Sequence, residues 1–266
     1  MESLKLTVPE IQKYGTEMLR VVSDICERNN IRWFMAYGSF LGAIRHHGPI
    51  PWDNDIDIYV PESDLPIFLS LMKKELPDKY WVDYRDDKKH PRAFPRIGLS
   101  GYETDWLHID VYRLGGFPTN KFEYKIFTWY SKFLKLIWKS KTLDIDFYYP
   151  DRKRRIVSKL IKLLTCWIPL NLVLKCIDRQ ANRIPFDKAK IVASPLTTMS
   201  PKRMHDRRIF DESILVDYAD FKVRVPKNYE QYLETQFGNW KEFPPEEVRN
   251  KEMVKISEVR KLRGGK

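Results

Sequence analysis

The chain has few cysteines and no long apolar run. Its 266 residues include three cysteines and no CxxC pair, so the sequence favours a reducing compartment over a disulfide-bonded secreted domain. The first residues, MESLKLTVPEIQKYG, contain no apolar segment, so we expect no signal peptide. The longest apolar stretch, residues 163–174, is 12 residues long, whereas a membrane-spanning helix needs about 18 or more. We therefore expect a cytoplasmic protein with only peripheral membrane contact.

Several catalytic motifs are also missing, and basic residues outnumber acidic ones. The sequence has no P-loop GxxxxGK[ST] and no Ser-His-Asp or Cys-His constellation, and its histidines lack zinc-site spacing. There are 36 Asp and Glu residues against 47 Lys and Arg, a net charge of +11, and 14% of residues are aromatic. Such a basic excess indicates an anionic partner: nucleic acid, a phosphorylated substrate or an anionic membrane.

Hydrophobic periodicity predicts a mixed α+β fold. Thr7 and Glu10 fit a capping box for a helix that ends near Asn29. Further helices are predicted over residues 40–46 and 63–76, and strands over 31–37, 55–60, 81–84, 94–99 and 107–114.

The rest of the chain divides into two segments. The middle is basic, aromatic and helical in pattern. The last segment contains a strand over residues 221–225, a helix over 229–237 and a charged tail expected to be an exposed helix. We predict three parts: a catalytic core over residues 1–115, a helical insertion over 116–200, and an α/β segment over 201–266 that completes the core.

The most informative motif is the DxD of Asp55 and Asp57. On a strand these two side chains point to the same face, roughly 7 Å apart, while Ile56 and Ile58 point to a buried face. Adjacent carboxylates repel each other unless a cation lies between them. Oxygen ligands of this kind suit Mg²⁺ or Mn²⁺.

The dyad alone leaves other interpretations open. A solvated acidic strand face is one, and the DxD of metal-dependent glycosyltransferases is another. An EF-hand is excluded, because Ile58 stands where its glycine is required and Asp64 where its bidentate Glu is required.

The residues upstream of the dyad narrow the choice. Gly38 and Ser39 join a predicted strand to a predicted helix, and a helix N-terminus with free N–H groups binds anions. A phosphate held there, beside a metal on the next strand, is the arrangement of nucleotidyltransferase-type phosphoryl transfer.

The segment YGSFLGAIRHHGPIPWDNDIDI, residues 37–58, resembles the signature of the LicD family, which includes fukutin and fukutin-related protein. The resemblance extends to HIDV at residues 108–111 and to VRVPKNYEQYLETQFGNWKEFPP near the C-terminus. It covers most of residues 10–115 and 205–246. This sequence departs from the family pattern at Asn54, where relatives often carry a third acid, and at residues 236–240.

The resemblance implies a nucleotidyltransferase-like core and a chemistry. Family members transfer a phospho-alcohol, such as phosphocholine, from a CDP-linked donor to a sugar hydroxyl of a glycan and release CMP. By this resemblance Asp55, Asp57 and Asp110 would bind Mg²⁺ or Mn²⁺ and act in catalysis, Asp110 as the proton acceptor. The donor would be bound by residues of the same motifs: Gly38, Ser39, Arg45, Trp52 and Asp53. Arg96 could meet phosphate, although an ordinary ion pair is as good an interpretation.

The middle segment predicts a membrane contact. On a helical wheel of residues 125–139, the lysines share one polar arc with Thr128 and Ser131, and apolar and aromatic side chains fill the rest. This pattern is typical of helices that lie in a membrane surface, although packing on the core would also explain it. Nucleic-acid binding is not expected, because no motif for it is present.

Together these observations predict a LicD-type phosphotransferase of the bacterial cytoplasm. It would use Mg²⁺ or Mn²⁺ and a CDP-alcohol donor, and CDP-choline is the first candidate for that donor. Its acceptor would be a cell-surface glycan or a lipid-linked precursor at the inner face of the cell membrane. The alternatives are a nucleotide-sugar glycosyltransferase and a non-enzymatic basic protein that binds membrane or nucleic acid.

Overall fold

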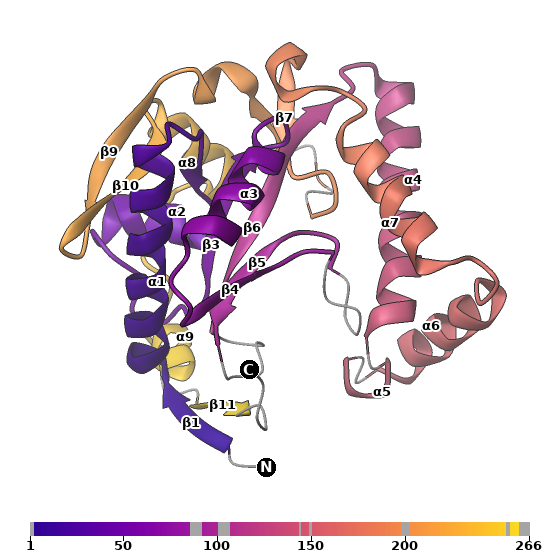
Figure 1. Cartoon of the computed structure of the whole chain (residues 1–266), viewed down its shortest axis with the longest axis horizontal. Coiled ribbons are helices and arrows are strands. Elements are labelled where there is room, and N and C mark those ends of the chain that lie inside the picture. The colour runs from indigo at the N-terminus through magenta and orange to yellow at the C-terminus, as the bar shows by residue number, and fades with distance from the viewer. Residues whose placement is uncertain are drawn as a thin grey trace. The chain divides into compact units, whose positions relative to one another are not determined.

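The computed structural model describes residues 3–85, 92–100, 107–143, 145–148, 151–197, 200, 203–253 and 256–260. The chain forms two compact units, whose elements are labelled in Figure 1. The first contains Met1–Asp83, Phe94–Arg113 and Arg208–Lys266, and the second contains Tyr84–Ala93 and Leu114–Arg207. The division into residues 1–115, 116–200 and 201–266 stays a prediction.

A β-sheet with the strand order β2-β3-β6-β5-β4 forms the centre of the first unit. β2–β3, β4–β5 and β5–β6 are antiparallel pairs. The sheet places β3 directly beside β6 (Figure 1), so the DxD strand and the strand of Asp110 are neighbours. The predicted α+β class with a mixed sheet is confirmed. The strands are β2 (Phe34–Met35), β3 (Ile56–Pro61), β4 (Tyr80–Asp83), β5 (Arg96–Leu99) and β6 (His108–Phe117).

The first helix begins as its sequence predicts. α1 (Val8–Arg28) starts after Thr7, and Thr7 and Glu10 form the predicted capping box. Its apolar face is buried, including Met18, Leu19 and Val22. The other helices of this unit are α2 (Tyr37–Arg45), α3 (Leu65–Glu75), α8 (Tyr229–Phe237) and α9 (Glu246–Met253).

Two strand pairings were not predicted. β9 (Ser213–Tyr218) forms an antiparallel hairpin with β10 (Phe221–Pro226). β1 (Ser3–Thr7) pairs with β11 (Ile256–Arg260), the most distant strands in sequence. The expectation of a helical tail was therefore correct only for α9, because a strand follows it.

The structure corrects the sequence predictions in two places near the DxD motif. The strand predicted over residues 31–37 is only Phe34–Met35, and α2 begins at Tyr37 instead of residue 40. Tyr37 has a φ of 45°, a left-handed value that turns the chain at once from strand to helix. All six residues of β3 are buried, so both faces of this strand are covered.

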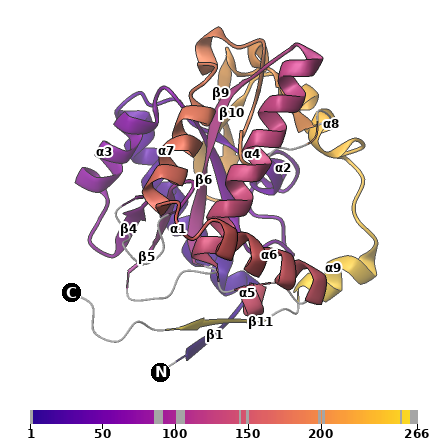
Figure 2. The ribbon, with the colours of Figure 1, turned by 90° about the vertical axis from the view of Figure 1, so that its right-hand side faces the viewer.

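The second unit is mainly helical, and α6 and α7 pack against α4 (Figure 2). α4 (Lys121–Thr142) is capped by the Asn120 side chain, and α6 (Arg152–Leu164) by that of Asp151. α5 (Ile145–Tyr148), α7 (Leu170–Ala181) and the 3-10 helix Phe186–Lys188 complete the helical part. The end of β6 pairs with β7 (Ile191–Ala193), which pairs with β8 (His205–Asp206). The short 3-10 helix Arg207–Phe210 leads back to the first unit.

One expectation about α4 was wrong. Thr128 and Ser131 were predicted to lie with the lysines on an outward polar arc, but both are buried. The Gln180 side chain of α7 donates hydrogen bonds to the Phe127 carbonyl and to the Ser131 hydroxyl, at 3.0 and 3.2 Å. The Gln180 amide therefore satisfies polar groups on the inner face of α4.

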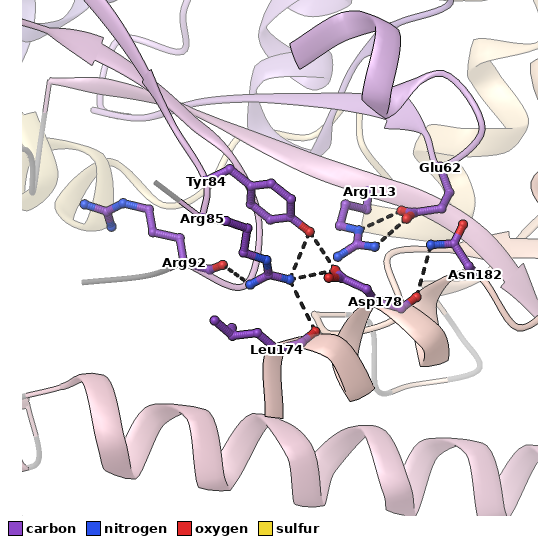
Figure 3. Close-up of polar contacts among 8 residues, drawn as sticks. All are labelled: Glu62, Tyr84, Arg85, Arg92, Arg113, Leu174, Asp178 and Asn182. Carbon is purple, nitrogen blue, oxygen red and sulfur yellow. Dashed lines mark hydrogen bonds and ion pairs between the residues drawn. The ribbon is translucent and has the colours of Figure 1, made fainter. Parts of the chain in front are cut away.

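Each unit contains an ion-pair group whose residues are drawn in Figure 3. In the first unit, Glu62 follows β3, and both of its oxygens accept bonds from Arg113 on β6. These two side chains are only 5% and 4% exposed. In the second unit, Arg85 donates to Asp178 of α7 at 2.6 Å, and the Tyr84 hydroxyl donates to the same carboxylate at 2.7 Å. The first pair joins the strands of Asp57 and Asp110.

Replacing Arg113 by Met is expected to lower the free energy of unfolding by about 3–5 kcal/mol, because the buried Glu62 carboxylate loses this guanidinium. The double variant Glu62→Leu/Arg113→Met should recover most of the loss. Urea unfolding curves of the three proteins measure the difference. Lys227→Met, which opens the exposed Lys227–Glu212 pair, is the control and should change little. A single variant as stable as the wild type would contradict the role of this pair.

Candidate active site

The first turn of α2 is fixed to β3 through the Ser39 hydroxyl. Ser39 Oγ accepts a hydrogen bond from the Asp57 N–H at 2.9 Å and donates one to the Asp55 carbonyl at 3.5 Å. The Ala36 N–H donates to the Asp57 carbonyl at 2.9 Å. Ser39 is 4% exposed, so its hydroxyl holds the DxD strand. The prediction that Ser39 binds donor phosphate therefore depends on backbone N–H groups of this helical turn.

Gly38 allows the Asp53 carboxyl to lie against the start of α2. A Cβ at position 38 would be 2.5 Å from Asp53 Oδ2, which is too close for any side chain. Asp53 is held in turn by Gln12 of α1, whose Nε2 donates to the Ile50 and Asp53 carbonyls at 2.7 and 2.6 Å. Gln12 was not predicted, because a single polar residue on a helix carries no motif.

Burial and mutual repulsion perturb the carboxyl groups of this site. Burial, the charge of Asp55 and a hydrogen bond with its side chain raise the pKa of Asp53 to about 8. The pKa of Asp57 is raised well above its usual range, first by burial and then by Asp55, Asp110 and Asp53. Asp57 Oδ1 has no hydrogen-bond partner within the described part of the chain. These groups hold protons that isolated aspartates would have lost.

Asp110 is in a different electrostatic position. Arg96 lies opposite it in the β5–β6 register and donates to Oδ1 at 2.6 Å, while His108 Nε2 lies 3.2 Å from the same oxygen. Burial alone would raise the pKa of Asp110, but the bond from His108 and the charge of Arg96 outweigh it and lower the pKa. Asp110 is therefore ionised. Arg96 therefore forms an ion pair with Asp110, which was one of its two interpretations from the sequence. Its contact with phosphate stays a prediction.

The donor atoms at this site suit a hard cation. Asp53, Asp55 and Asp57 supply only oxygen, and the unsatisfied Asp57 Oδ1 is a position where a positive charge would relieve repulsion. Among the described residues, however, no three His, Cys, Asp or Glu side chains are arranged as a metal site. The chemistry fits Mg²⁺ or Mn²⁺, and the set of Asp55, Asp57 and Asp110 as ligands stays a prediction.

Arg45 and Trp52 lie in a second, aromatic cluster. Arg45 Nη1 donates to the Trp240 and Glu242 carbonyls at 3.0 and 3.1 Å, and its Cζ is 4.7 Å from the Phe243 ring centre. The Trp52 ring contacts the Phe243 ring, with centroids 6.3 Å apart. The structure thus does not place the Arg45 guanidinium among the carboxylates, and its predicted contact with donor phosphate is untested.

A group of tyrosines packs next to the carboxylates, and the Tyr112 hydroxyl lies 3.5 Å from Asp110 Oδ2. Tyr37 contacts Tyr112 and Tyr59, with ring centroids 5.0 and 5.2 Å apart, and the Tyr37 N–H donates to the Tyr232 hydroxyl at 3.1 Å. Burial, followed by the charge of Asp57, raises the pKa of Tyr112. Tyr232 comes from α8, so the C-terminal segment helps to hold the start of α2.

Comparison with known proteins finds relatives that match the part of the chain containing these residues. The model of the LicD/FKTN/FKRP nucleotidyltransferase domain matches residues 30–158. The chain is also 23% identical over 257 residues to the lipopolysaccharide cholinephosphotransferase LicD of Haemophilus influenzae, covering 91% of this chain and 94% of that protein. Residues 30–158 thus match the LicD family, and the similarity to the Haemophilus influenzae protein extends over most of the chain. Human ribitol 5-phosphate transferase FKRP is 32% identical over 99 residues, which is 36% of this chain and 19% of that protein.

The LicD match contains every predicted site residue. It runs from before β2 to the middle of α6, so it reaches further into the basic segment than the quoted motifs do. Three residues that support the site lie outside it: Gln12, Tyr232 and Phe243. The resemblance predicted from the sequence is confirmed. Side chains from both flanking segments contact the matched part of the chain.

The raised pKa values predict that the protein without divalent metal loses stability as the pH rises. An unfolded Asp releases its proton near 3.8, whereas folded Asp53 keeps it until about pH 8, so the folded state binds more protons in between. The free energy of unfolding should fall by up to about 1.4 kcal/mol per pH unit for each such group. Thermal unfolding in EDTA across this range measures the slope.

Asp53→Asn should make that slope shallower, because it removes one of the two groups and lowers repulsion on the other. Asp217→Asn is the control, since Asp217 is exposed and the hydrogen bond from Lys222 lowers its pKa. An identical slope of the free energy of unfolding against pH in the wild type and in Asp53→Asn would show that Asp53 does not contribute to this pH dependence.

Proposed function

We propose that this protein transfers a phospho-alcohol, phosphocholine in the first instance, from a CDP-linked donor to a sugar hydroxyl of a glycan, with release of CMP. The observation that carries the proposal is the carboxylate group of Asp53, Asp55, Asp57 and Asp110 beside the first turn of α2, inside a LicD-family domain. The names of the bacterial and human relatives support transfer of a phosphorylated alcohol.

The start of α2 suits binding of the donor phosphates, and the carboxylates suit binding of a metal ion. The N–H groups of Gly38 and Ser39 at the start of α2 would bind the donor phosphates, because a helix N-terminus favours anions. Asp55, Asp57 and Asp110 would hold Mg²⁺ or Mn²⁺. When bound, the metal neutralises diphosphate charge and favours departure of CMP.

Asp110 would accept the proton of the attacking sugar hydroxyl. Its lowered pKa keeps it ionised, and Arg96 and His108 fix its orientation from β5 and from its own strand. An oriented, charged carboxylate within reach of a hydroxyl is what general-base catalysis requires. Arg45 and Trp52, beside Phe243, would form the outer wall of the donor site.

The acceptor would be a cell-surface glycan or its lipid-linked precursor. We place the reaction in the bacterial cytoplasm, at the inner face of the cell membrane, where a lipid-linked sugar would be presented. A nucleic acid has no part in this proposal.

Incubation with CDP-choline, Mg²⁺ and a glycan acceptor should release CMP, and Asp55→Asn or Asp57→Asn should lower the rate at least about 1000-fold. The amide retains the shape of the side chain and removes the charge that a metal requires. Asp24→Asn, on the exposed side of α1, is the matched control and should keep the wild-type rate. CMP release assayed by chromatography gives the rates. A rate that survives both substitutions would contradict the metal-dyad mechanism.

A donor screen separates the transferred groups. CDP-choline, CDP-ribitol, CDP-glycerol, CDP-ethanolamine and UDP-sugars would each be offered, and the mass change of the acceptor would be measured. Transfer of a sugar from a UDP donor would replace this proposal with the glycosyltransferase alternative.

Gly38→Ala should lower the rate of CMP release about 10-fold or more, because its Cβ would displace the Asp53 carboxyl. Gly48→Ala is the control: the atom nearest to its added Cβ is 3.9 Å away, an ordinary contact. Thermal unfolding checks that both variants fold. Equal activity of the two variants would show that close packing of Asp53 on α2 is not needed.

A further inference from the structure

α6 exposes its apolar side and buries almost nothing. Four apolar residues, Ile156, Leu160, Leu163 and Leu164, are 50–70% exposed, and Trp167 just beyond the helix is 78% exposed. At about 100° per residue the four fall within an arc of about 100°, opposite Ser158, the only described residue of this helix that is buried. α6 thus rests on the unit by its small polar side and turns its hydrophobic side outward.

α4 repeats this arrangement. Five apolar side chains are 36–71% exposed: Phe122, Ile126, Trp129, Phe133 and Leu136. They lie within an arc of about 80°, opposite the buried Phe127, Ser131 and Leu134. The rings of Trp129 and Phe133 stack in parallel with centroids 5.8 Å apart. We call the outward side chains of α4 and α6 the apolar stripes.

The two stripes belong to one packed body. α4 and α6 contact each other, and Lys141 Nζ near the end of α4 donates to the Thr165 carbonyl after α6 at 2.6 Å. Within the described residues no helix is long and apolar enough to cross a membrane. Exposed hydrophobic surface of this extent marks an interaction site.

The charge around the stripes selects the partner. α4 and α6 together contain 12 Lys and Arg, six on each helix, against one acid, Glu123. On α6, Arg152 and Lys159 border one side of the stripe and Lys153 lies within its arc. On α4, Lys125 and Lys132 border one side. A second copy of this chain would bring two such basic surfaces together, which is repulsive.

We propose that the apolar stripes of α4 and α6 dock the protein on the surface of an anionic lipid bilayer. The aromatic and leucine side chains would enter the boundary between headgroups and acyl chains, and the flanking lysines and arginines would contact lipid phosphates. Each such cation near the surface contributes about 1 kcal/mol. The inference concerns where the protein binds and holds whichever donor it uses.

Vesicle flotation tests the proposal. The wild type should float with vesicles of phosphatidylcholine mixed with phosphatidylglycerol, and at least about 10-fold less with phosphatidylcholine alone. The triple variant Trp129→Ser/Leu163→Ser/Trp167→Ser should lose about 10-fold or more of the binding to anionic vesicles. Because these side chains are exposed, the variant should fold, and its circular dichroism checks this.

The matched control removes three exposed apolar side chains from the other unit, Ile67→Ser/Leu215→Ser/Phe237→Ser. It should float as the wild type does. The rate of CMP release with a water-soluble acceptor should be the same in both triple variants, so membrane binding and catalysis are tested separately. The proposal is overturned if the wild type does not float, if both triple variants float equally, or if light scattering shows dimers that only the first triple variant loses.

Discussion

Repulsion among four neighbouring carboxyl groups, of which Asp57 is buried, is the constraint on which the rest of the site depends. Asp53, Asp55, Asp57 and Asp110 lie close enough to raise the pKa of Asp57 together. Such a group stays in place only if the backbone around it is fixed. The Ser39 hydroxyl, the Gln12 amide and the buried Glu62–Arg113 pair each fix one part of it. The fold therefore holds an unfavourable charge arrangement that a cation would make favourable.

Local patterns in the sequence located the DxD segment better than they located the side chains that hold it in place. Alternation predicted a strand at the DxD motif, where β3 contains Asp57 and begins one residue after Asp55, and the Gly-Ser turn predicted the adjacent helix, because both features are local. Gln12, Tyr232 and Phe243 could not be found in this way. Their contacts join residues far apart in the chain, and no local pattern records which distant side chain fills a given space.

The same limit explains the errors in the secondary structure. The early start of α2 depends on the left-handed φ of Tyr37, a conformation that a tyrosine adopts only under tertiary constraint. On α4, a helical wheel separates polar from apolar side chains but cannot say which side a neighbour covers. Gln180 donates hydrogen bonds to the Phe127 carbonyl and the Ser131 hydroxyl. Thr128 and Ser131 are buried, although they share the polar arc of the helical wheel with the exposed Lys125 and Lys132.

The pairing of β1 with β11 and the contact of Tyr232 with Tyr37 have a consequence for biosynthesis. The first unit is built from three separate stretches of chain, and its last stretch begins at Arg208. Most of the helical unit leaves the ribosome before that stretch is made, so local helix contacts can form first and the long-range strand contacts last. A nascent chain would therefore present its basic helices well before it could assemble the carboxylate site.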